Sequence, residues 1–206
     1  MRVSEGRVAL HYATKNLEER ILRAFEAAGK PRAKITADDL MAVDEFHIGG
    51  REATAAIAAQ MQLRRGMRLL DVGSGIGGPA RHFASAHGCE VTGIDLTAEY
   101  VRTARALTAF VGMSASAKFE QGSATELPFA DQMFEGAYIL HVGMNIEDKC
   151  KLFREIKRVL QPGSVFAIYD VMRIGPGDLQ FPVPWASAAQ ESFVASVRRL
   201  PKGAGP

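Results

Sequence analysis

The chain has 206 residues, of which 47% are hydrophobic and 23% are charged. This is the balance of a globular domain with a core of its own. A formal net charge of +2, with Lys and Arg scattered along the chain, argues against a nucleic-acid partner. No apolar run is long enough to span a membrane, and "MRVSEGRVAL" lacks the apolar stretch of a signal peptide. The two cysteines form no metal-binding pair, so we expect a cytoplasmic protein with no membrane partner and no metal site.

The first part of the chain predicts a cap of short helices. Residues 16–28 have the spacing of an amphipathic helix. The apolar residues on its one face are Leu17, Ile21, Leu22 and Phe25. Thr36, followed three residues later by Asp39, predicts the start of a second short helix. The glycine pair at 49–50 then breaks the chain before an alanine-rich stretch, 51–63, that favours a third helix.

From residue 67 the pattern alternates between strands and helices. The expected strands are 67–72, 89–95, 117–122, 134–140 and 164–171. The expected helices are 78–87, 98–111 (capped by Thr97) and 147–160. Such alternation predicts a parallel sheet covered by helices, an α/β fold. Residues 172–206 differ, because they hold five of the nine prolines and no convincing strand; only about 185–198 favours a helix.

A glycine-rich turn follows the first expected strand. "LLDVGSGIGGPAR", residues 69–81, satisfies both the G-x-G-x-x-G pattern of dinucleotide enzymes and the G-x-G-x-G pattern of S-adenosylmethionine (SAM) enzymes. In either case the glycines let an anionic group approach the amides at a helix N-terminus. Asp95, at the end of the second strand, suits the ribose of either cofactor. Asp71 lies inside the first strand, where a carboxylate suits a ligand with an ammonium and a sulfonium better than a pyrophosphate.

Four ordered motifs extend this pattern: "LLDVGSGIGGPAR", "GIDLT", "LPFADQMFE" and "FREIKRVLQPGS". With them the sequence resembles the class I SAM-dependent methyltransferases of the ubiquinone/menaquinone C-methyltransferase-like group. It is also similar to phosphoethanolamine and sarcosine/dimethylglycine N-methyltransferases. The resemblance covers roughly residues 40–171. It implies a Rossmann-like sandwich with an N-terminal helical cap at 1–50, a SAM-binding core at 51–171 and an irregular tail at 172–206.

The resemblance also implies a set of residues around the cofactor. These are His47, Ile48, Gly49, Asp71, Gly73, Ser74, Gly75, Asp95, Leu96, Ser123 and Ala124. In this set the glycine loop lines the methionyl part with Asp71 nearby, and Asp95 holds the ribose hydroxyls. Leu96 packs on the adenine, and residues 47–49 close over the cofactor from the N-terminal side. The expected reaction is transfer of a methyl group from SAM to a small-molecule acceptor.

Four positions in this scheme either depart from the family or have a second interpretation. Ser123 would edge the adenine with Ala124, but the family usually has Asp at the position of Ser123, where it accepts from the adenine amino group. His141, after the fourth strand, would face the transferable methyl as a general base, or it is a core histidine. Met144 and Asn145 either line the acceptor pocket or only shape the loop.

The end of the chain departs from the family, whose sheet is completed by an antiparallel hairpin that residues 172–206 do not predict. An open edge at the fifth strand is an association hazard. We therefore expect either that the tail covers this edge, with Phe181, Trp185 and Phe193 on apolar surface, or that two copies form a homodimer there. Two other functions stay open: a SAM-binding protein with weak or no catalysis, and an NAD-dependent oxidoreductase, for which no hydride-acceptor site is found.

Overall fold

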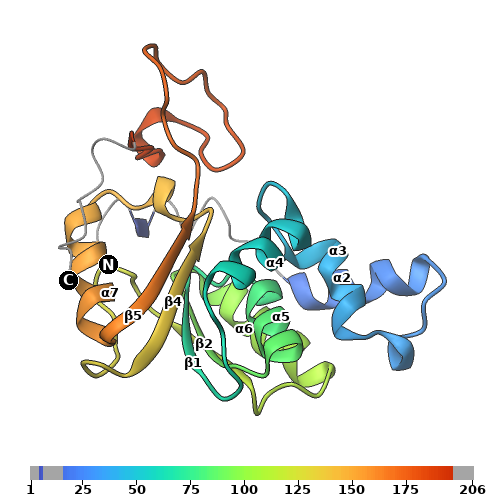
Figure 1. Ribbon diagram of the computed structural model, residues 1–206. Coiled ribbons are helices and arrows are strands. Elements are labelled where there is room, and N and C mark those ends of the chain that lie inside the picture. The colour runs from blue at the N-terminus through green and yellow to red at the C-terminus, as the bar shows by residue number, and fades with distance from the viewer. Residues whose placement is uncertain (1–4, 7–15, 197–206) are drawn as a thin grey trace.

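The computed structural model describes residues 5–6 and 16–196. Its centre is one sheet of five strands in the order β3-β2-β1-β4-β5, with every neighbouring pair parallel (Figure 1). The strands are β1 (Arg68–Val72), β2 (Glu90–Asp95), β3 (Ala117–Gln121), β4 (Phe134–Leu140) and β5 (Leu160–Tyr169). The α/β fold predicted from the alternating pattern is confirmed.

Helices cover both faces of the sheet. They are α2 (Leu17–Ala27), α3 (Ala37–Asp44), α4 (Gly50–Gln60), α5 (Gly78–His87), α6 (Ala98–Phe110) and α7 (Lys149–Val159). Leu69 of β1 points into a core shared with α4, α5 and α6, whereas its neighbour Leu70 points into a core shared with α7. Successive residues of a strand face opposite sides, and both leucines are fully buried. This explains why β1 has a continuous apolar run: its two faces are both covered.

The N-terminal helices form an outer layer beside α5 and α6 (Figure 1). Their apolar faces bury Ile21, Leu22 and Leu40 against Leu107 of α6. Helix α3 begins at the predicted capping box, in which the Thr36 side chain accepts from the backbone of Asp39 and the Asp39 side chain accepts from that of Thr36. The helices predicted at 16–28, after Thr36 and from 51 are therefore present.

A buried ion pair ties this layer to the core. Arg81 of α5 donates to Asp44 Oδ2 at the end of α3 (2.7 Å), to the backbone carbonyl of Ile76 (2.8 Å) and to Thr108 Oγ1 of α6 (2.7 Å). Both charged side chains are 1% exposed. The pair thus joins three helices at one point of the interior.

Three details differ from the sequence predictions. Strand β5 starts at Leu160 rather than at residue 164, because Leu160 already pairs with Phe134 of β4. The register between the two strands then shifts, and the proline–glycine turn lies at this irregularity within β5. Thr97 precedes α6, but its side chain makes no capping hydrogen bond. Its backbone N–H donates instead to Asp95. In the predicted helix at 185–198, the described part contains only a 3₁₀ turn at Ala189–Glu191, and residues 197–198 lie outside the described part.

The tail takes a different course from the one expected. It rises from β5, passes above the C-terminal ends of the strands and returns towards α7 (Figure 1). There Phe193 N donates to Met144 O at 2.7 Å, so the tail packs on the loop after β4 instead of covering the edge of β5. No strand of the described residues pairs with the outer edge of β5. The homodimer through this edge stays a prediction.

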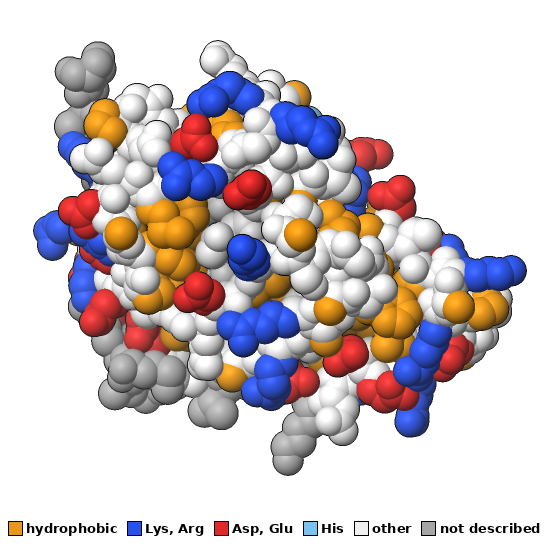
Figure 2. Space-filling view, turned by 90° about the horizontal axis from the view of Figure 1, so that it is seen from below, with side chains coloured by type: hydrophobic (Ala, Val, Ile, Leu, Met, Phe, Trp, Pro, Cys, Tyr) orange, Lys and Arg blue, Asp and Glu red, His pale blue; other side chains and the backbone are white. Residues whose placement is uncertain are grey.

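The face of the molecule seen from below shows no large field of one charge among the described residues. On the face seen from below, Lys and Arg side chains lie scattered among Asp and Glu side chains (Figure 2). In two of the ion pairs one partner is largely exposed to solvent: Arg64, which pairs with Glu135, and Asp131, which pairs with Arg158. Within the described part of the chain, no helix combines the length and apolarity needed to cross a bilayer.

Candidate active site

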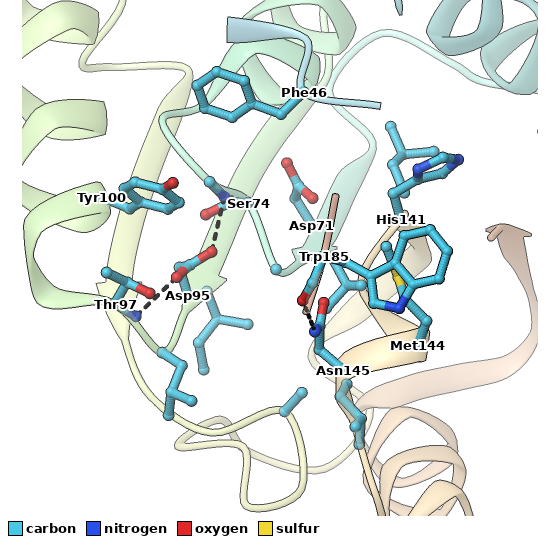
Figure 3. A pocket seen from close by; sticks show the side chains of 18 of the residues that line it. Phe46, Asp71, Ser74, Asp95, Thr97, Tyr100, His141, Met144, Asn145 and Trp185 are labelled. Atoms are coloured by element: carbon cyan, nitrogen blue, oxygen red, sulfur yellow. Dashed lines mark hydrogen bonds between the residues drawn. The ribbon is translucent and has the colours of Figure 1, made fainter. Parts of the chain in front are cut away.

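A cavity of about 450 Å³ lies at the C-terminal ends of β1, β2 and β4 (Figure 3). Open parallel sheets bind ligands at this end, where the strand order reverses. Every predicted site residue except Gly49 lines the cavity. Gly49 is instead the N-cap of α4, with φ at 81° and no room for a larger residue because a Cβ would lie 3.0 Å from that of Ala53. The other residues lie together, and their roles stay predictions.

The glycine loop between β1 and α5 is held by the neighbouring strand. Gly73 N and Ser74 N both donate to Ile94 O of β2, at 2.8 and 3.0 Å. Gly73 has φ at 78°, and a Cβ there would lie 2.3 Å from the side chain of Val142, so only glycine fits. Gly75 also has a positive φ (54°), but its missing Cβ would face open space. The space beside Gly75 is therefore free for a ligand.

Asp95 is held at the end of β2 by two backbone amides. Its Oδ2 accepts from Gly75 N at 2.9 Å and its Oδ1 from Thr97 N at 2.8 Å, which fixes the carboxyl group towards the cavity (Figure 3). Burial raises the pKa of Asp95, while the amides of Thr97 and Gly75 lower it. A carboxylate has about four acceptor positions, so two hydroxyl donors can bind beside these two amides.

Asp71 is a buried acid with an unsatisfied oxygen. It lies in β1, pairs with Gly93 and Tyr138 in the neighbouring strands, and is 2% exposed. Its Oδ2 has no hydrogen-bond partner among the described residues, and the side chain points into the cavity (Figure 3). Burial raises the pKa of Asp71 to about 8; the hydroxyl of Tyr138 opposes this rise, and the charge of Asp95 adds to it. A cationic ligand would satisfy this group.

The far end of the cavity, beyond Asp95, has a carboxylate that the sequence motifs did not predict. Ser123 Oγ donates to Glu5 Oε1 at 2.5 Å, and Thr125 Oγ1 donates to the same oxygen at 3.4 Å. Glu5 lines the cavity with Leu96 and Ala124. Because Glu5 and Ser123 are 118 residues apart, no local pattern could have predicted that they meet.

Two histidines lie on the opposite side. The His47 side chain is 4% exposed, and its Nε2 lies 2.9 Å from Glu45 Oε2 and 3.0 Å from Thr54 Oγ1. The ring of His141 lies 6.0 Å from that of His47 and 5.3 Å from that of Tyr169. His47 is therefore held by Glu45 and Thr54, which favours a positioning role.

His141 is held in an unusual backbone conformation. Its φ is 53°, which is uncommon for a residue other than glycine, and its N–H donates to Tyr169 O at 2.8 Å. Burial lowers the pKa of His141, and His47 lowers it further. Both effects favour the neutral imidazole, which is the form that can accept a proton.

The loop after β4 and the tail complete the wall around His141. Met144, Asn145 and Trp185 line the cavity there (Figure 3). Asn145 Nδ2 donates to Trp185 O at 2.9 Å, and Trp185 Nε1 donates to Ser192 Oγ at 3.0 Å. The sequence predicts that Trp185 covers the open edge of the sheet. This prediction is wrong, because Trp185 lines the cavity. Its position follows from the turn of the tail over the strands.

Comparison with known proteins identifies the domain. The family described as "Methyltransferase domain" matches residues 70–168. Among curated proteins, methyltransferase phqN of Penicillium fellutanum is 35% identical over 116 residues, 56% of this chain and 36% of the relative. Sterol 24-C-methyltransferase ERG6B of Gibberella zeae is 34% identical over 114 residues, 55% of this chain and 30% of the relative. The chain thus spans about a third of the length of these relatives.

A solved structure supports the same assignment over more of the chain. Phosphoethanolamine N-methyltransferase 2 of Haemonchus contortus, in complex with SAM, superposes with a TM-score of 0.66 at 25% identity. The match covers 86% of this chain and 41% of that one. The family resemblance predicted from the four motifs is confirmed: residues 70–168 form a methyltransferase domain of the class I SAM-dependent type.

Proposed function

We propose that this protein binds SAM in the cavity above β1, β2 and β4 and transfers its sulfonium methyl group to a small-molecule acceptor. The observation that carries the proposal is the pair of buried acids on either side of the glycine loop. Asp95 is oriented by two amides, and Asp71 has an unsatisfied oxygen towards the cavity. SAM has ribose hydroxyls for the first and an ammonium and a sulfonium for the second.

The order of these groups sets the direction of the cofactor. With the methionyl part beside Asp71 and Gly75 and the ribose on Asp95, the adenine extends over the ends of β2 and β3. That end of the cavity is lined by Leu96, Ser123 and Ala124. The sulfonium methyl then faces the opposite side, where His141 lies. Three parts of the chain are predicted: a cap at 1–50, a core at 51–171 and a tail at 172–206. Each of them contributes residues to the lining of this cavity.

The adenine amino group needs an acceptor that Ser123 alone supplies poorly. Glu5 Oε1 lies 2.5 Å from Ser123 Oγ, so a carboxylate is present at the same edge although it comes from the other end of the chain. We propose that Glu5 takes the part that Asp usually has at position 123 in the family. The N-terminal segment would then contribute directly to cofactor affinity.

Methyl transfer requires alignment more than activation, because the sulfonium is already a good leaving group. Holding the acceptor in line with the S–CH₃ bond supplies most of the rate. His141, neutral and without a side-chain hydrogen bond to another described residue, is the group that takes up an acceptor proton. His47, bonded to Glu45, packs behind His141 and positions it.

Calorimetric titration with S-adenosylhomocysteine tests the cofactor site. Asp95→Ala should weaken binding by about tenfold or more, since each charge-assisted hydrogen bond contributes about 1.5–3 kcal/mol. Asp71→Asn should weaken it as well, by removing the charge that pairs with the ammonium. Asp178→Ala, at a fully exposed acid of the tail, is the matched control. Unchanged affinity in both cavity variants would rule out this site.

A further inference from the structure

The charged residues that line the cavity are all acidic. They are Glu5, Asp44, Asp71, Asp95, Glu147 and Asp148, and no described residue on the lining is Lys or Arg. Arg81 pairs with Asp44 and burial favours the neutral form of Asp71, so the negative field comes from the other acids. A cleft lined by one sign of charge focuses that field on its contents. An anionic acceptor would lose hydration on entering and gain no cationic partner, which is costly.

Two described cations beside the cavity, Arg51 and Lys149, already have partners. Arg51 donates to Glu45 at 2.7 Å. The ammonium of Lys149 donates to the backbone carbonyls of Gly143 (2.6 Å), Phe193 (2.9 Å) and Ile146. Lys149 therefore holds the tail against the loop after β4 and is not free to receive a phosphate or a carboxylate. Neither of these two described cations is therefore available to a ligand in the cavity.

The wall on the acceptor side is apolar and aromatic. Trp185 and Met144 lie beside His141 (Figure 3), and Ile48 and Val171 also line the cavity. The backbone of Trp185 is fixed by Asn145 and its indole N–H by Ser192, so the indole presents its apolar surface with its donor satisfied. Flat ring systems stack well on such a surface.

From this lining we infer that the acceptor is an uncharged, largely apolar molecule with a ring system, which stacks on Trp185 and is methylated on a hydroxyl oxygen. The inference rests on the proposed function and specifies its substrate class. Acceptors with a phosphate or carboxylate group are excluded by the acidic lining.

The reaction involves the acceptor hydroxyl, the sulfonium methyl group and the ring of His141. A lone pair of the acceptor hydroxyl oxygen forms the new C–O bond with the methyl carbon. The C–S bond breaks, and its electron pair returns to sulfur, so that the sulfonium becomes the neutral thioether of S-adenosylhomocysteine. The hydroxyl proton passes to the neutral ring of His141 and from there to solvent. The products are the methyl ether, S-adenosylhomocysteine and one proton.

Fluorescence of Trp185 provides a local test, because it is the only tryptophan of the chain. The protein saturated with S-adenosylhomocysteine is titrated with 2-naphthol, which is neutral, and with 6-hydroxy-2-naphthoate, which differs by one carboxylate. We expect saturable quenching by 2-naphthol, with a dissociation constant about tenfold or more below that of the naphthoate, a difference of about 1.4 kcal/mol. Equal affinities, tighter binding of the naphthoate, or no saturable quenching by 2-naphthol would overturn the inference.

A charge placed in the wall sharpens the test. Ile48 is 68% exposed, so Ile48→Lys can be accommodated, and it should reduce the preference for 2-naphthol over the naphthoate. Ile48→Met keeps the wall neutral and should preserve that preference. An unchanged preference in Ile48→Lys would contradict the electrostatic explanation.

Turnover gives a second readout. With 2-naphthol as acceptor, Trp185→Ala should raise KM more than it lowers kcat, whereas Ile174→Ala, at a 98% exposed tail residue, should change neither. Equal KM values for Trp185→Ala and the unmodified protein would also overturn the inference. Calorimetry with S-adenosylhomocysteine separates the two levels: its failure to bind the unmodified protein refutes the proposed function, whereas binding with no preference between the naphthols refutes only the acceptor class.

Discussion

Replacing Arg81 by methionine should destabilise the protein more than any change at an exposed ion pair. The substitution keeps a long apolar side chain but removes the guanidinium that bonds Asp44, Ile76 O and Thr108. The Asp44 carboxyl is then left buried without its partner. Its Oδ1 already has no hydrogen bond among the described residues, so no second described group stabilises the carboxylate when the guanidinium is removed.

The expected magnitude follows from the burial of both groups. Removing one member of a buried ion pair costs about 3–5 kcal/mol, because the remaining charge is uncompensated. The total stability of a domain is about 5–15 kcal/mol, so the loss is a large share of it. By contrast, Arg102→Met breaks a pair with Glu99 in which the arginine side chain is 66% exposed, and such surface pairs contribute about 0–1 kcal/mol.

The effect should also depend on pH. Burial raises the pKa of Asp44 to about 6, although Arg81 opposes this rise; without Arg81 the pKa is higher still. A carboxyl with a higher pKa in the folded than in the unfolded state binds a proton on folding. Its penalty is therefore absent below the unfolded-state pKa, grows as pH rises from that value to the folded-state pKa, and stays constant above it. Arg81→Met should lose more stability at about pH 8 than at about pH 5.

Urea denaturation followed by circular dichroism at the two pH values measures both effects. The difference in midpoint, multiplied by a common m-value, gives the change in the free energy of unfolding. A loss no larger than that of Arg102→Met, or a loss of the same size at both pH values, would refute the view that Asp44 is a buried charge compensated by Arg81.

Four further changes test individual contacts. His141→Asn, which tolerates a positive φ, should lower kcat by about 10²–10⁴-fold in the 2-naphthol assay and leave the affinity for S-adenosylhomocysteine unchanged. Glu5→Gln should weaken calorimetric binding of S-adenosylhomocysteine but not of S-inosylhomocysteine, which lacks the amino group. Gly73→Ala should cost about 1–3 kcal/mol in urea denaturation because the new methyl group meets Val142. Thr36→Ala should cost about 1 kcal/mol in the same assay through the lost cap.

Local patterns in the sequence were sufficient for the frame of this protein. Helix α5 and strand β4 have the predicted bounds, 78–87 and 134–140, because a glycine turn followed by a proline and a bounded apolar run each specify an element within a few residues. The same patterns put Asp71 and Asp95 on adjacent parallel strands, whose carboxyl ends necessarily meet at one edge. Cofactor class and family could therefore be predicted from the sequence.

Tertiary structure decided the contacts between distant segments. Glu5 meets Ser123, Arg81 meets Asp44 and Asn145 meets Trp185 only because separate elements pack together. No periodicity or spacing encodes these meetings. Likewise, Thr36 and Thr97 both precede helices, but only the side chain of Thr36 caps its helix. The sequence thus determined at which end of the sheet the candidate site lies, and the packing of the tail and N-terminal segments determined what encloses it.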